Sequence, residues 1–125
     1  MKKSILDIST VYAKHLGARI SPKKVAPVAD LIRGKGVKDA KVILTFDTTK
    51  GSDMILKVLK SAEANAKHNN QLANDKLFVS QVWVGPGPTA KRGRIVAKSR
   101  MSPILKRTSN IYVGLSERPG KTPKN

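Results

Sequence analysis

Residues 77–116 read LFVSQVWVGPGPTAKRGRIVAKSRMSPILKRTSNIYVGLS, and this stretch decides the fold. Both of its ends, residues 77–84 and 110–115, alternate in side-chain character with a period of two, which predicts two β-strands. If these strands pair, the turn between them falls near Ala97. Each side then extends about 12 residues beyond the core, or ~40 Å at ~3.3 Å per residue. The sequence therefore predicts a long hairpin in place of an ordinary turn.

The alternation also assigns the faces of the first of these strands. One predicted face holds Phe78, Ser80, Val82 and Val84, and the other holds Leu77, Val79, Gln81 and Trp83. The chain has only five aromatic residues in all. Trp83 could stack on a nucleic-acid base, but this scarcity favours an anchor at the point where the hairpin leaves the core.

The segment between the two strands, residues 85–107, is basic and has few large apolar residues with which to fold alone. No acidic residue occurs between Val82 and Ser116, whereas a solvated surface normally mixes both signs of charge. A long insertion in a compact domain is usually either disordered or functional. Although a solvated flexible loop is the competing interpretation, we expect an arm that orders on nucleic-acid phosphates. Its predicted contacts are Lys91, Arg92, Arg94, Lys98, Arg100, Lys106 and Arg107.

The residues before this stretch predict a strand and three helices. Residues 11–20 suggest a short strand. Ser21 and Pro22 form a start signal for the first helix, which Gly34 ends. Pro27 removes a backbone donor within it, so we expect a kink or a helix shortened to the part from Val28 onward.

The second helix is predicted over residues 37–44, with Val37, Ala40, Ile43 and Leu44 facing inward. The third is predicted to start with Ser52 as its cap and to end at Asn69 and Asn70. Its apolar stripe consists of Ile55, Leu59, Ala62 and Ala66.

Composition excludes several classes of protein. The chain has 125 residues, 25 Lys and Arg against 8 Asp and Glu, a formal charge of +17 and no cysteine. A disulfide scaffold or a cysteine-ligated zinc site is therefore excluded, and with only His15 and His68 as nitrogen ligands we expect no metal and no cofactor. No apolar run approaches the ~18 residues of a membrane span, and Asp7 interrupts any leader-like start. We expect a soluble, unexported protein whose partner is a polyanion, above all nucleic acid.

A second basic patch is predicted on and around the first helix. It consists of Arg19, Lys23, Lys24, Arg33, Lys35 and Lys38, with only Asp30 as a counter-charge. A lysine-rich helix face is also commonly just solvated. No Ser, His and acid form a suggestive arrangement, and Glu63 with Asp75 makes no evident acid–base pair, so we expect neither catalysis nor a small-molecule substrate.

Four ordered blocks give a resemblance between about Ala13 and Ser116. They are SPKKV at 21–25 leading to VADLIRGK at 28–35, SAEANA at 61–66 followed by Asn69, Gly87-Pro88 followed by Lys91-Arg92, and ILKRTS at 104–109. In these blocks the chain resembles the bacterial-type large-subunit ribosomal protein twenty-two family. It departs from the family's usual Pro-Arg-Ala-x-Gly-Arg tip, because Ile95, Val96 and Ser99 replace the Pro, the first Arg and the Gly.

The resemblance implies an α+β fold: three helices packed on a small three-stranded antiparallel sheet, with a long protruding β-hairpin. We accordingly expect one globular domain from residues 11–84 and 108–116, an inserted arm at 85–107, and tails at 1–10 and 117–125.

It also implies a structural constituent of the large ribosomal subunit that binds large-subunit rRNA, supports assembly, contacts neighbouring ribosomal proteins, and places its hairpin tip in the wall of the nascent-peptide tunnel. Such a protein is cytoplasmic, with an organelle the other possibility. Family positions carry over to a tip formed by Lys91, Arg92, Arg94, Lys98 and Arg100 and to an arm base formed by Lys106, Arg107, Thr108 and Ser109. The alternative from another class is an architectural double-stranded-DNA-binding protein with β-arms.

Overall fold

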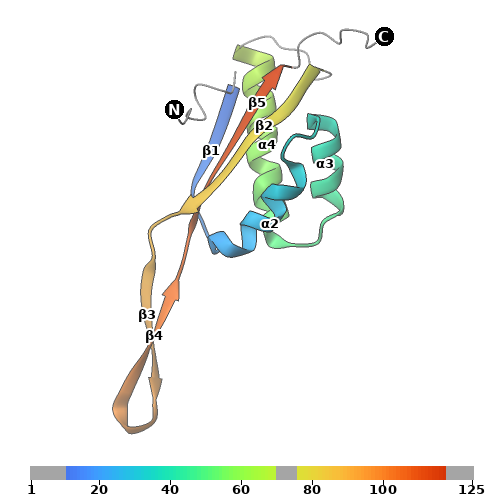
Figure 1. Ribbon diagram of the computed structural model, residues 1–125. Coiled ribbons are helices and arrows are strands. Elements are labelled where there is room, and N and C mark those ends of the chain that lie inside the picture. The colour runs from blue at the N-terminus through green and yellow to red at the C-terminus, as the bar shows by residue number, and fades with distance from the viewer. Residues whose placement is uncertain (1–10, 70–75, 118–125) are drawn as a thin grey trace, which may run out of the picture.

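The computed structural model describes residues 11–69 and 76–117, and it has three helices on one face of a sheet, with an arm projecting from the end of that sheet (Figure 1). The predicted α+β class is confirmed. In chain order the elements are β1 (Val11–Ala18), α2 (Pro22–Ile32), α3 (Val37–Phe46), α4 (Lys50–Asn69), β2 (Leu77–Pro86), β3 (Ala90–Val96), a 3-10 turn (Ala97–Ser99), β4 (Arg100–Lys106) and β5 (Ser109–Glu117).

The sheet has the order β1-β5-β2, so the last strand of the described chain lies in the centre. Val113 of β5 pairs with Ala13 on one side and with Val82 on the other, both antiparallel. The arm is a separate two-stranded ladder, β3 with β4, that closes with Val96 opposite Arg100. The predicted long hairpin with its turn near Ala97 is therefore confirmed.

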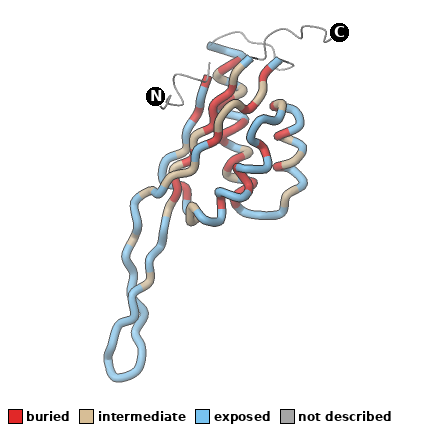
Figure 2. Tube along the Cα trace, in the orientation of Figure 1, coloured by how far each residue is buried: buried red, intermediate tan, exposed pale blue. Residues whose placement is uncertain are grey.

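The core lies between the sheet and the helices, whereas the arm is exposed along its length (Figure 2). The predicted stripe of α4 is confirmed, since Ile55, Leu59, Ala62 and Ala66 are fully buried. In the described ranges, no helix combines the length and the apolar character that crossing a membrane requires.

The predicted faces of β2 are wrong beyond Val79. The register of β2 against β5 shifts between Val79 and Gln81. This bulge adds one residue to β2 and so reverses the alternation after it. Leu77, Val79 and Val82 are consequently all buried, while Trp83 is exposed on the other face of the sheet. Trp83 therefore lies near the point where the arm leaves the sheet, but it does not pack into the core.

Shortening of the first helix, one of the two effects expected of Pro27, does not occur, because α2 runs from Pro22 to Ile32 through it. Pro27 and Lys23 are both exposed. The Lys23 carbonyl that loses a helical donor to the proline can therefore be hydrated, which lowers the penalty of a proline at this position. Gly34, which adopts a φ of 82°, follows the helix and donates its N–H to Val79 O at 2.9 Å.

Ser52 is not the cap of α4, because the helix begins at Lys50 and Ser52 is buried in its first turn. The turn before the helix is organised by Asp47, whose Oδ1 accepts the Thr49 N–H at 3.0 Å. Hydrogen bonds from the Ser52 hydroxyl and from the Thr49 backbone lower the pKa of Asp47. The sequence pattern, a hydroxyl residue before an apolar stripe, could not show whether the helix starts at Lys50 or after Ser52.

The base of the arm is fastened by hydrogen bonds on both strands. The Gly87 N–H donates to Thr108 O at 2.9 Å, and the Thr108 hydroxyl donates to Pro88 O at 2.6 Å. The Ser109 hydroxyl donates to Ile20 O at 2.5 Å, which ties β5 to the turn before α2. These bonds fix the position at which the arm leaves the sheet.

Gly87→Ala is expected to loosen this base, because a Cβ at Gly87 would lie 2.5 Å from Thr108 Oγ1. We expect the free energy of unfolding, measured by urea denaturation, to fall by about 1–3 kcal/mol through this overpacking. Gly85→Ala is the matched control, since a Cβ there meets nothing within 4 Å. Equal stability of the two variants would contradict the role given to the Gly87–Thr108 contact.

Candidate nucleic-acid interface

The ladder of the arm separates its side chains into two faces, because residues that pair across two strands lie on the same face. Arg92 pairs with Ile104, Arg94 with Ser102, Val96 with Arg100, and Ala90 with Lys106. We call this side the basic face; its cations are Arg92, Arg94, Arg100 and Lys106, all exposed.

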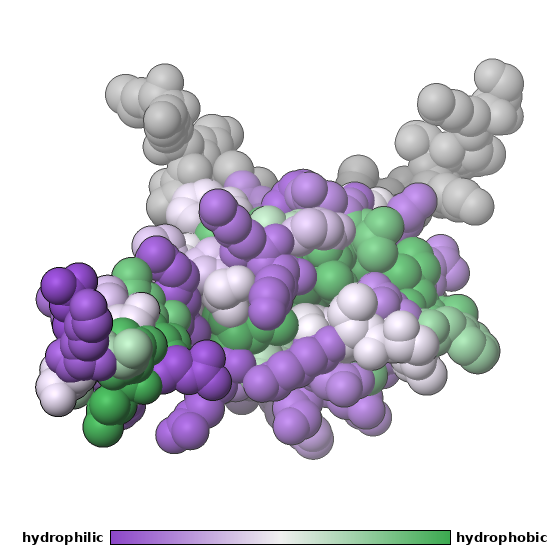
Figure 3. All heavy atoms as spheres, turned by 90° about the horizontal axis from the view of Figure 1, so that it is seen from below, coloured by the Kyte–Doolittle hydropathy of each residue, from purple (hydrophilic) through white to green (hydrophobic). Residues whose placement is uncertain are grey.

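The opposite side of the arm is mainly apolar. Ile95 pairs with Met101, Gly93 with Pro103, and Lys91 with Leu105. Met101 folds over Gly93 so closely that a Cβ there would overlap its sulfur. Figure 3 views the molecule from the arm end and shows hydrophilic and hydrophobic residues gathered on different parts of that end. We call this side, defined by Ile95, Met101, Pro103 and Leu105, the apolar face.

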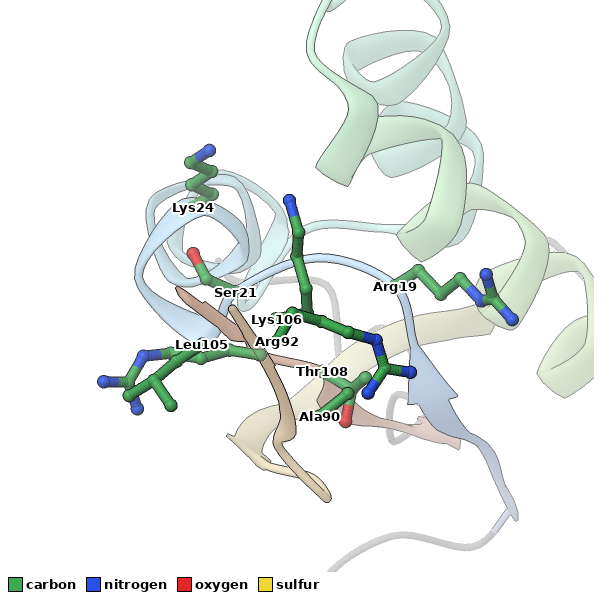
Figure 4. Close-up of a pocket in the computed structure, with 9 residues that line it drawn as sticks. Arg19, Ser21, Lys24, Ala90, Arg92, Leu105, Lys106 and Thr108 are labelled. Carbon is green, nitrogen blue, oxygen red and sulfur yellow. The ribbon is translucent and has the colours of Figure 1, made fainter. Parts of the chain in front are cut away.

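The basic face ends in a hollow of about 780 Å³ between the arm base and the turn before α2. The hollow joins cations that are far apart in the sequence, Arg19 and Lys24 from the globular part and Arg92, Lys106 and Arg107 from the arm. Ser21, Ala90, Leu105 and Thr108 complete its lining, which contains no acidic residue. Figure 4 shows Lys24 and Lys106 pointing to the same side, while Arg19 and Arg92 extend in opposite directions. We call these nine residues the basic hollow.

The cations of the basic hollow repel one another in the free protein. An anion with several oxygens, such as a phosphate diester, relieves this repulsion and accepts hydrogen bonds from several of them at once. The arrangement therefore suits a polyanion with repeated phosphates. No group of three or more His, Asp or Glu side chains in residues 11–69 and 76–117 is placed to hold a metal ion.

The other predicted cations of the globular part lie outside the basic hollow. Arg33 donates to Asp30 and, at 2.7 Å, to Val82 O. It therefore joins the end of α2 to β2, a structural use that its sequence neighbourhood did not reveal. The three remaining residues, Lys23, Lys35 and Lys38, are exposed along α2, the loop after it and α3.

Ser109 is a correction to the predicted interface. It is fully buried, and its hydroxyl donates a hydrogen bond to Ile20 O. No surface of this side chain is left for a phosphate, so its role is to hold the arm base in place. Thr108, the other predicted contact at this point, lines the basic hollow, and its hydroxyl donates to Pro88 O.

The sequence did not point to Lys50 as part of this region. Its ammonium donates to Arg19 O at 2.9 Å across 31 residues of chain, which adds a cation beside the backbone of the turn before α2. No local pattern marks this lysine, because the contact depends on how α4 packs beside β1.

Comparison of the sequence with known proteins points to one family. The family model described as ribosomal protein L22p/L17e covers residues 13–116, from β1 through the arm to β5. The chain belongs to this family. Curated relatives named large ribosomal subunit protein uL22 are 47% identical over 111 residues in Lactobacillus delbrueckii subsp. bulgaricus and 48% identical over 112 residues in Lactobacillus gasseri. The first alignment spans 89% of this chain and 95% of the relative, and the second 90% and 96%.

The tip of the arm makes a left-handed turn at two residues that are not glycine. Lys98 and Ser99 have φ values of 60° and 56°. Side chains other than glycine are disfavoured in this region, by about 1 kcal/mol or more for each residue. The turn is therefore made with backbone strain that glycine at these positions would avoid.

Inorganic phosphate is expected to stabilise the free protein through the basic hollow. Tens of millimolar phosphate should raise Tm above the value in chloride of equal ionic strength, because it screens the repulsion at this site more than bulk salt does. Thermal unfolding of a Lys24→Gln/Lys106→Gln variant should show a smaller rise. A Lys57→Gln/Lys60→Gln variant on exposed α4 positions is the control and should keep the full rise; an equal loss in both variants would contradict a specific site.

Proposed function

We propose that this chain is a structural, non-enzymatic protein of the large ribosomal subunit that binds large-subunit rRNA and supports assembly of the subunit. The observation that carries the proposal is the basic face of the arm, which continues into the basic hollow at the arm base. Its relatives are named large ribosomal subunit proteins, and the L22p/L17e family consists of ribosomal proteins. A protein of this kind needs no cofactor and no small-molecule substrate.

The arm binds by neutralising phosphates along its length. Each of its strands has seven residues, which span ~23 Å at ~3.3 Å per residue. Four cations on one face over this distance can follow a groove between RNA backbones, and each neutralised phosphate releases counterions. The basic hollow holds the backbone at the arm base, where the RNA also meets α2. Arm and globular part thereby clamp RNA segments that converge on the protein.

The tip of the arm lies in the wall of the nascent-peptide tunnel in this proposal, with neighbouring ribosomal proteins around the globular part. Support comes from the tip itself, where Ile95 is 81% and Met101 is 69% exposed. Apolar side chains left uncovered beside Lys98 and Arg100 suit a surface that passing peptides contact without being held. The compartment is that of the ribosome, the cytoplasm in a bacterium.

Neutralising the basic face is expected to weaken RNA binding and its salt dependence together. In an Arg92→Gln/Arg94→Gln/Arg100→Gln variant, the negative slope of log K against log[salt] for a large-subunit rRNA fragment should become shallower by about two to three. Circular dichroism should show an unchanged core, since all three side chains are exposed on the arm.

The control for this experiment removes three charges from α4, at the exposed residues Lys57, Lys60 and Lys67. Its slope should change much less than that of the arm variant. Identical slopes would show that net charge, and not the arm, determines binding. Equal affinity for a double-stranded DNA of the same length would favour the architectural DNA-binding alternative.

A further inference from the structure

The sheet has an open face, opposite the helices, on which the aromatic residues of this chain are concentrated. Alternation along the strands places four of the five aromatic residues there, because their neighbours in sequence are the buried ones. They are Tyr12, Phe78, Trp83 and Tyr112. The apolar core is on the other face, so packing against the helices does not explain this concentration.

One row of the sheet joins a cation to two of these rings. Lys14 of β1 pairs with Tyr112 of β5, and Tyr112 pairs with Trp83 of β2. Side chains opposite each other on one face are about 5 Å apart at Cβ, so the three lie side by side across the sheet. Trp83 is 45% exposed and Tyr12, in the next row, is 40% exposed.

The charges of the molecule distinguish this face from the helical side. Among the described acidic residues, only Glu117 belongs to a strand, and it is the last residue of β5. The other five, Asp30, Asp39, Asp47, Asp53 and Glu63, belong to the helices and the turns between them. The row of Lys14, Tyr112 and Trp83 therefore places two aromatic rings beside a cation, with no described acidic residue paired in this row.

We propose that this open face binds one unpaired nucleotide of RNA, whose base stacks on Trp83 and Tyr112 while the adjacent phosphate lies at Lys14. Exposed aromatic rings on a sheet stack unpaired bases, and a nearby lysine accounts for the backbone charge. The site lies next to the arm, because Trp83 is only three residues before the end of β2 at Pro86. The inference rests on the proposed RNA-binding function and adds a second mode to it: the arm contacts phosphates, and the open face contacts a base.

Trp83 is the only tryptophan in the chain, so its fluorescence reports on this face alone. The full chain is titrated with a single-stranded 12-nucleotide oligouridylate and, separately, with a 12-base-pair RNA duplex, each carrying a dye for anisotropy. Stacking should quench Trp83 strongly with the single strand and weakly with the duplex.

Variants separate stacking from general charge attraction. Lys14→Gln should raise the midpoint of quenching by the single strand roughly five-fold, and Trp83→Leu should weaken single-strand binding by anisotropy roughly ten-fold. Lys60→Gln, an exposed lysine on α4, is the matched control and should leave the quenching midpoint unchanged. Circular dichroism of each variant checks that the sheet is intact, and an equal shift for Lys14→Gln and Lys60→Gln would overturn the assignment of Lys14.

The readouts also separate this inference from the proposed function. Binding by anisotropy without quenching of Trp83 would leave RNA binding in place and overturn the nucleotide site. Absence of binding by anisotropy would overturn both. A blue shift of Trp83 emission that depends on protein concentration, without quenching by RNA, would assign the face to a second copy of the chain.

Discussion

The insertion of β5 between β1 and β2 is the constraint on which the rest of this structure depends. Both edges of this last strand are hydrogen-bonded, so the sheet is complete only when residues far apart in the chain have met. Because β5 runs antiparallel to β2, the segment between them must leave and return at one end of the sheet. The arm is the direct result: its two strands continue the same pairing, displaced by one residue between Pro86–Ser109 and Ala90–Lys106.

Charge is divided between the layers of the molecule in a way that opposes the stability of the free arm. Five of the six described acidic side chains lie in the helices and the turns between them, where Asp30 contacts Arg33 and Glu63 contacts Lys41. All charged side chains of the arm are cations, and the arm has no buried core of its own. A two-stranded ladder is marginal in water, and like charges along it weaken it further. In the function proposed above, the RNA that neutralises these charges supplies much of the free energy that orders the arm, while hydrogen bonds to the sheet fix its base.

The sequence predicted correctly those features that are determined by residues within a single segment. The stripe on α4, the hairpin with its turn near Ala97 and the exposed arm cations all follow from periodicity and charge within one segment. What could not be predicted depends on contacts across the chain. The bulge after Val79 reverses the faces of β2, and burial removes the Ser109 side chain from the predicted interface. Arg33 donates a hydrogen bond to the carbonyl of Val82, a residue far away in the sequence. The basic hollow belongs to the same class, since its two halves meet only after β5 has paired.

The separation of basic and apolar faces along the arm has a consequence for how its length can change in related genes. Side chains alternate across a strand with a period of two, so deleting or adding a single codon in β3 would exchange the two faces beyond that point. Arg94 would then lie with Met101 and Pro103, and Ile95 with the cations of β4. Deleting or adding two codons in each strand shortens or lengthens the arm and keeps its faces. Arm length in such lineages should therefore vary in even steps per strand.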